Sequence, residues 1–204
     1  MTRILAVTDA VAEQLPDCCG DCVFWQRTHT ETRAATKRRW ARVAERRFGP
    51  WGRVLHEQGV FRGVIQYGPR ALFPRTRVMP AGPASSDAAV VTCVYFGDED
   101  RAGTCERLFL EALADLQGRH VSAVEAFAIN YPDDVPHADR FGAHHTLFDR
   151  VFLERLGFDV VRSTGQVALM RLGLADPPAG ARRPLARIAA GVRRVQGRRQ
   201  TPSS

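Results

Sequence analysis

The feature that most constrains the fold is a central stretch in which a buried strand runs through a glycine-containing turn into a helix. Residues 88–96 read Ala-Ala-Val-Val-Thr-Cys-Val-Tyr-Phe, an apolar run rich in β-branched residues and typical of a strand buried on both faces. An acidic turn at 97–103 follows, and residues 104–117 carry leucines at helical spacing. A strand that feeds directly into a helix predicts a mixed α/β fold.

The segments on either side extend this pattern. Before the central strand, we expect a strand at 3–8, a short helix at 9–15, a helix at 30–48, a hairpin of strands 51–56 and 60–67, and an irregular stretch at 68–87. After the central helix, we expect a strand at 121–129, a loop at 130–143, a helix at 144–156, and strands at 158–162 and 166–174. This order predicts one α/β (α+β) domain over residues 1–176.

The charge of the chain is concentrated at its C-terminal end. The 204 residues carry a net charge of +7, but from residue 177 onward there are seven arginines and no acidic residue. Residues 1–176 therefore carry 22 basic and 22 acidic side chains. We expect residues 177–204 to be a flexible Arg-rich tail, either a solubilising extension or a site for an acidic partner, a membrane surface or nucleic acid. The neutral core gives no indication of nucleic-acid binding.

The sequence predicts neither a membrane span nor an export signal. No apolar run approaches the ~20 residues that a spanning helix needs, and residues 1–9 lack the pattern of a signal peptide. The five cysteines are an odd set without the density of a disulfide scaffold, so we expect reduced thiols and a cytoplasmic location.

Over residues 3–174 the element order, with its turn after the fourth strand, resembles the GNAT superfamily of N-acetyltransferases. The resemblance implies a mostly antiparallel sheet, flanked by helices and splayed between its fourth and fifth strands. Acetyl-CoA would lie in that opening, with its pantetheine arm against the backbone of Val94, Tyr95 and Phe96. The segment Cys-Gly-Asp-Cys-Val-Phe-Trp at 19–25 is similar to a subgroup with a Cys-Xaa-Xaa-Cys-Xaa-Phe-Trp motif.

In the same resemblance, the turn before the central helix holds the pyrophosphate of the co-substrate. Backbone N–H groups at a glycine turn and a helix N-terminus suit an anion, and the corresponding residues here are Arg101, Ala102, Gly103, Thr104 and Cys105. The motif departs from the family pattern at Asp100, where Gln or Arg is usual, and at Cys105, where a small residue is usual.

A third departure concerns the general acid. Family members often carry a Tyr four residues before a Gly-Phe pair, and that position is Leu153, ahead of Gly157 and Phe158.

Three side chains are candidates for proton transfer. Glu125 is a lone carboxylate in an apolar strand, which suits either a base with a raised pKa or a carboxylate paired with an arginine. His145, beside His144 at the start of a predicted helix, suits either a proton shuttle or a solvated histidine. The hydroxyl of Tyr95 either donates a hydrogen bond at the site or belongs to core packing.

The spacing of Cys19 and Cys22 supplies half of a zinc site. Cys18 is adjacent, but no second Cys-Xaa-Xaa-Cys or paired Cys/His motif exists, so we predict no metal and expect buried thiols that pack near Trp25.

These observations give two functional hypotheses. The first is an N-acetyltransferase that moves an acetyl group from acetyl-CoA to a primary amine of a small molecule or protein by direct attack. The second is a GNAT-fold binding protein that acts through its basic tail or its Cys/Trp segment.

Overall fold

The computed structural model describes residues 1–28, 34–97, 101–132, 134–136, 140 and 146–174. Its helices are α1 (Asp9–Ala12), α2 (Asp17–Gly20), α3 (Ala34–Phe48), α4 (Arg101–Gly118) and α6 (Arg150–Arg155), with the 3-10 turns η1 (Arg70–Leu72) and η2 (Pro74–Arg77). Its strands are β1 (Thr2–Ala6), β2 (Gly52–Glu57), β3 (Val60–Pro69), β4 (Ala88–Phe96), β5 (Ala123–Ile129), β6 (Phe148–Asp149), β7 (Asp159–Thr164) and β8 (Val167–Gly173). The predicted tail at 177–204 and His145 lie outside the described residues.

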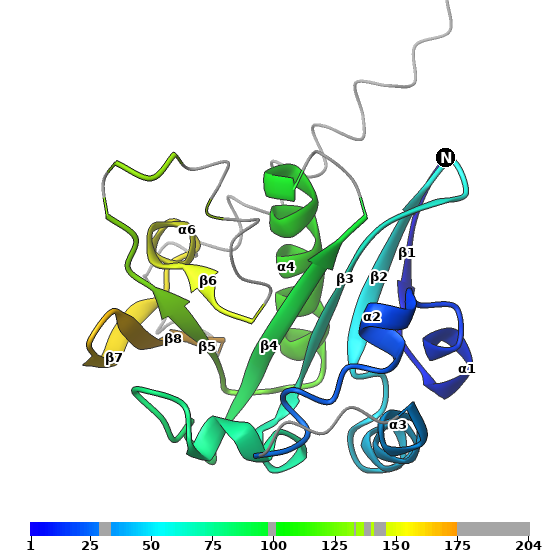
Figure 1. Ribbon diagram of the computed structural model, residues 1–204, viewed down its shortest axis with the longest axis horizontal. Coiled ribbons are helices and arrows are strands. Elements are labelled where there is room, and N and C mark those ends of the chain that lie inside the picture. Colours follow the sequence, from blue (N-terminus) through cyan, green and yellow to red (C-terminus); the bar gives the residue numbers. More distant parts are fainter. Residues whose placement is uncertain (29–33, 98–100, 133, 137–139, 141–145, 175–204) are drawn as a thin grey trace, which may run out of the picture. The chain divides into compact units, whose positions relative to one another are not determined.

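The strands form one eight-stranded sheet of mixed direction (Figure 1). Its order is β1-β2-β3-β4-β5-β8-β7, with β6 paired to β5. The β4–β5 and β5–β6 pairs are parallel and the other pairs are antiparallel. Because β4 and β5 are parallel, their connection must cross over, and α4 makes that crossover.

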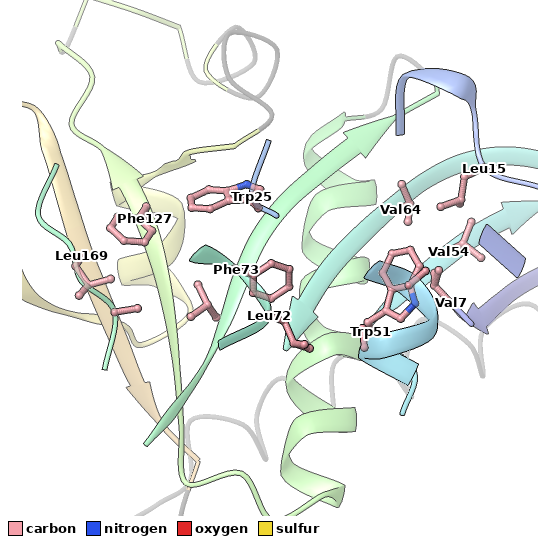
Figure 2. Close-up of a cluster of buried hydrophobic side chains, with 14 of the residues drawn as sticks. Val7, Leu15, Trp25, Trp51, Val54, Val64, Leu72, Phe73, Phe127 and Leu169 are labelled. Atoms are coloured by element: carbon pink, nitrogen blue, oxygen red, sulfur yellow. The ribbon is translucent and has the colours of Figure 1, made fainter. Parts of the chain in front are cut away.

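Helices cover both faces of the sheet, and neighbouring residues of β3 show how. A Cβ placed on Gly63 would lie 2.9 Å from Thr104 Cγ2, so Gly63 faces α4. Val64, pointing the other way along the pleat, belongs to a core cluster that includes Ala41 and Ala44 of α3 (Figure 2). The sheet is therefore buried on both sides, as the apolar β4 sequence requires.

Most predicted elements are present with ends that differ by a few residues, and two of the differences bear on the site. Strand β4 occupies the predicted residues, but α4 begins at Arg101, three residues before the predicted start. Of the helix predicted at 144–156, the part at 148–149 is wrong, because Phe148 belongs to strand β6 and pairs with Ala128. Residues 144 and 145 lie outside the described part of the chain. The Phe148 ring lies 5.0 Å from that of Phe109 on α4, and this packing overrides the local helical spacing.

No helix among the described residues combines the length and the apolar character needed to cross a membrane.

Candidate functional site

The central feature of the site is the place where β4 and β5 part (Figure 1). They pair from Ala88 with Ala123 to Val91 with Ala126, and among the described residues the pairing ends there. Strand β5 continues to Ile129 in register with β8, whereas β4 beyond Val91 is paired with β3 only. The predicted splay between the fourth and fifth strands is therefore present, and its vertex lies at Val91.

A β-bulge lies at this vertex. Gln66 of β3 pairs with Cys93 and Tyr67 pairs with Val91, so Thr92 is an extra residue in β4. Gln66 Nε2 donates to Thr92 Oγ1 at 2.8 Å, and Thr92 Oγ1 donates to the Gln66 carbonyl at 3.2 Å. A bulge bends the strand and interrupts its ladder, which is typical of strand ends beside functional sites.

A buried lysine joins this pair. Lys37 of α3 is 6% exposed, and its Nζ donates to Gln66 Oε1 at 2.7 Å. Its Nζ also lies 4.7 Å from the ring centroid of Trp40 and 5.3 Å from that of Trp51. Burial lowers the pKa of Lys37 below its ordinary value, since the charged form is desolvated.

Sequence reasoning did not select Lys37 for the site. The helical spacing could have indicated that Lys37 is buried. It precedes the buried Ala41 and Ala44 by four and seven residues, so the three lie on the same face of α3.

Thiols gather on the same side of the vertex. Cys93 of β4 interacts electrostatically with Cys19 and Cys22 of the N-terminal segment, and all three interact with Lys37. Burial raises the pKa of Cys93 to about 11 and raises that of Cys19 as well, so both are thiols at neutral pH. Within the described residues no three potential metal ligands lie close enough to hold an ion.

Tyr95 lies two residues beyond Cys93 on the diverging part of β4. Its side chain is partly exposed, and the pKa of its hydroxyl is raised, chiefly by a hydrogen bond with Cys18. The hydroxyl therefore remains protonated at neutral pH and can serve as a donor at the opening.

The Cys/Trp segment reaches across the vertex to β5. Trp25 is 1% exposed and stacks on Phe127 of β5 with ring centroids 5.8 Å apart (Figure 2). Arg75 of η2 holds the segment by donating its backbone N–H to the Trp25 carbonyl at 3.3 Å and its side chain to the Phe24 carbonyl. These contacts place the segment beside the parted strands.

The N-terminus of α4 follows the diverging end of β4. Arg101 and Ala102 are exposed, Gly103 is partly buried, and Thr104 and Cys105 are buried. The five residues predicted to form a turn are thus the first residues of a helix of 18 residues. The aligned peptide dipoles give this end a partial positive charge.

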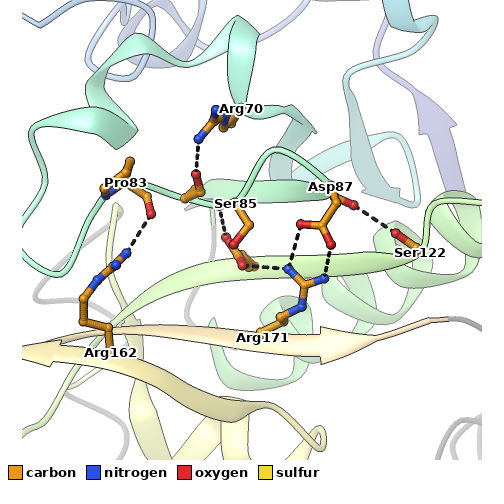
Figure 3. A network of polar contacts seen from close by, with 9 residues as sticks. Arg70, Pro83, Ser85, Asp87, Ser122, Arg162 and Arg171 are labelled. Carbon is orange, nitrogen blue, oxygen red and sulfur yellow. Dashed lines mark hydrogen bonds and ion pairs between the residues drawn. The ribbon is translucent and has the colours of Figure 1, made fainter.

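Glu125 has both carboxylate oxygens engaged, by Ser85 and Arg171, which are labelled in Figure 3. It is fully buried, and it accepts from the Ser85 N–H at 2.7 Å and from Arg171 Nη1 of β8 at 2.9 Å. Arg171 also donates to Asp87 at 2.6 Å. The residue lies opposite Val90, in the paired part of the strands. This geometry favours the alternative of an arginine-paired carboxylate.

The structure thus brings some predicted site residues together and not others. The backbone of Val94, Tyr95 and Phe96 forms the diverging edge of β4, and α4 begins soon after it. His145 lies outside the described residues. Leu153 is fully buried in α6, so the position of the family's usual tyrosine offers no hydroxyl.

A cavity of about 370 Å³ opens between α1, α2 and α3 on the side of Lys37. Lys37 contributes to its wall, together with the acidic residues Glu13, Asp17 and Asp21.

No model of a known protein family matches the chain, and no curated protein matches it. Solved structures do match in shape. An N-acetyltransferase from Staphylococcus aureus Mu50 has 13% identity and a TM-score of 0.53, over 85% of this chain and 99% of that one.

Two further solved structures also match the chain in shape. The protein yncA of Salmonella typhimurium, solved with its cofactor acetyl-CoA, has 13% identity and a TM-score of 0.56, over 89% of this chain and 98% of its own. The loading GNATL domain of CurA from Lyngbya majuscula has 13% identity and a TM-score of 0.51, over 85% and 98%. Likeness at this identity concerns the fold, and it confirms the predicted fold class.

Proposed function

We propose that this protein is an N-acetyltransferase that moves an acetyl group from acetyl-CoA to a primary amine by direct attack. The observation that carries the proposal is the parting of β4 and β5 at Val91, followed by a helix that begins soon after β4 ends. The shared fold of yncA, solved with acetyl-CoA, supports it. The Cys/Trp subgroup, the cytoplasmic location and the separate tail at 177–204 stay predictions.

The residues present fit the co-substrate. The backbone of Val94, Tyr95 and Phe96 offers hydrogen-bonding groups on the edge that β5 leaves, which suits the amide groups of pantetheine. The first N–H groups of α4, over residues 101–105, suit the pyrophosphate. Arg101 is exposed beside them and adds a positive charge.

The chemistry needs positioning and two proton movements. The neutral acceptor amine attacks the thioester carbonyl, a C–N bond forms, and the C–S bond breaks as CoA thiolate leaves. We assign the donor that meets this thiolate to Tyr95, because it lies on the part of β4 that diverges from β5 and Leu153 has no hydroxyl. Both carboxylate oxygens of Glu125 already accept hydrogen bonds from Ser85 and Arg171, so we do not assign Glu125 as the base that deprotonates the amine. His145 stays a predicted proton shuttle.

Calorimetric titration of the full chain with acetyl-CoA tests the proposal. The unchanged chain should bind, and Gly103→Glu should abolish binding because it sets a carboxylate against the pyrophosphate. Gly118→Glu is the matched control, since it adds the same charge at the far end of the same helix, where a Cβ would meet nothing within 4 Å.

Two results would contradict the proposal. One is the absence of detectable heat for the unchanged chain at millimolar acetyl-CoA. The other is equal binding by the Gly103 and Gly118 variants. A chain that binds acetyl-CoA should also release CoA in the presence of one or more members of a panel of primary amines, measured by chromatography.

A further inference from the structure

Lys37 is the only lysine among the 29 basic residues of the chain. An arginine stays protonated in proteins, whereas a buried lysine can lose its proton and become a nucleophile. This amine is buried and is joined through Gln66 to the bulge at the vertex. Its position therefore bears on acetyl transfer.

Two side-chain hydrogen bonds connect this amine, through Gln66, to the hydroxyl of Thr92. Lys37 Nζ donates to Gln66 Oε1 at 2.7 Å, and Gln66 Nε2 donates to Thr92 Oγ1 at 2.8 Å. Thr92 is the bulged residue, next to Val91, where β4 and β5 part. A thioester seated at the vertex would thus lie near the amine.

The contacts of Gln66 also orient the amine. Gln66 Oε1 accepts from Gln26 Nε2 at 3.0 Å as well as from Lys37. The Gln66 carboxamide also donates to Thr92, so the oxygen that accepts the hydrogen bond from Lys37 is held in place. An uncharged amine uses one N–H for this bond and keeps its lone pair for another partner.

The surroundings of Lys37 favour its uncharged amine form. Lys37 is 6% exposed, and desolvation lowers its pKa in spite of the nearby ring faces of Trp40 and Trp51. Two of the neighbouring thiols are protonated at neutral pH, since burial raises the pKa of Cys19 and of Cys93, so these two provide no full negative charge. Lys37 also lines the cavity between α1, α2 and α3.

We propose that Lys37 is a self-acetylation site, at which the chain's own amine takes the acetyl group of bound acetyl-CoA. This inference rests on the proposed function. The lone pair of Nζ forms a C–N bond to the acetyl carbonyl carbon, and the C–S bond breaks with its electron pair going to CoA. The proton that Nζ loses passes to the thiolate, which leaves as CoA thiol. The product is a neutral amide whose remaining N–H can still donate to Gln66 Oε1.

The test is incubation of the full chain with acetyl-CoA, followed by intact-mass measurement and peptide mapping. We expect one acetyl group, located on Lys37. The first residue provides an internal reference, because Met1 is 92% exposed and its α-amine has a lower ordinary pKa than a lysine. Chemical reactivity alone would therefore label Met1 first, and site-directed transfer should label Lys37 first.

Three controls make the result specific. Lys37→Arg keeps a cation and removes the nucleophile, so the mapped mark should disappear. Gln66→Met removes the oxygen that orients the amine and should slow the labelling of Lys37. The same chain unfolded in urea should lose the preference for Lys37 over Met1.

The outcomes separate this inference from the proposed function. If calorimetry shows no binding of acetyl-CoA, the proposed function fails and the inference fails with it. If acetyl-CoA binds but Lys37 stays unmodified, or is labelled no faster than Met1, only the self-acetylation site is refuted. Equal labelling of Lys37 in the folded and unfolded chain would also refute it.

Discussion

Replacing Arg171 with methionine removes the cation that faces a fully buried carboxylate. Glu125 has no exposed surface, and Arg171 Nη1 donates to it at 2.9 Å (Figure 3). Methionine retains most of the apolar stem of arginine, so packing against β8 changes little. The variant chiefly leaves Glu125 with the Ser85 N–H as its remaining partner among these contacts.

The expected loss of stability follows from burial. Removing one member of a buried ion pair costs about 3–5 kcal/mol, because the other charge is left uncompensated. The Arg171 side chain is 29% exposed, so water screens part of the loss, and we expect about 2–3 kcal/mol. With a urea slope of about 2 kcal/mol/M, this lowers the unfolding midpoint by about 1–1.5 M.

Arg162→Met is the matched control for a urea titration followed by circular dichroism. Arg162 of β7 binds the loop that precedes β4, but it donates to the neutral carbonyls of Ala81 and Pro83 at 2.8 and 2.7 Å. Its removal therefore leaves no buried charge without a partner. We expect a loss of about 1 kcal/mol.

A double variant completes the test. Glu125→Gln combined with Arg171→Met leaves no buried charge and keeps an amide oxygen for the Ser85 N–H, so it should recover much of the loss. The reasoning is refuted if Arg171→Met costs no more than Arg162→Met, or if the double variant is no more stable than Arg171→Met alone.

Three further predictions concern the vertex and its neighbours. The pKa of Lys37 is lowered from its ordinary 10.5 in the folded chain, so below pH 10.5 the folded chain binds fewer protons than the unfolded chain. The free energy of unfolding should therefore rise as the pH increases toward 10.5. Urea titrations should show a smaller rise for Lys37→Met. Trp25→Ala removes a buried ring stacked on Phe127 and should cost about 3–5 kcal/mol in the same assay, with a cost below about 1 kcal/mol showing that the segment does not join the core. Gly63→Ala sets a Cβ 2.9 Å from Thr104 Cγ2, so it should displace the start of α4, cost about 1–3 kcal/mol and weaken acetyl-CoA binding, whereas unchanged affinity would separate that helix end from the site.

The sequence predicted the architecture well where apolar patterning is strong. Strand β4 runs from Ala88 to Phe96 as predicted, because its residues are apolar on both faces. The parting from β5 was an expectation from the family resemblance, since pairing partners lie far apart in the chain and no local pattern marks where a ladder ends.

The chemistry of the site was harder to predict. A carboxylate in an apolar strand looks the same in sequence whether it is a base or a paired anion, and the arginine that decides the matter for Glu125 is Arg171, 46 residues away. Lys37 was not selected from the sequence, although it precedes the buried Ala41 by four residues. Its role became visible only when Gln66 and Thr92, from two other elements, were seen to meet it.

The most direct test of the central claim is a crystal structure of the full chain with acetyl-CoA. We expect the pantetheine arm to lie along β4 beyond Val91 and the pyrophosphate to lie at the first N–H groups of α4. The acetyl carbon should face Lys37. A co-substrate bound away from the β4–β5 opening, or an opening without density at saturating acetyl-CoA, would contradict it.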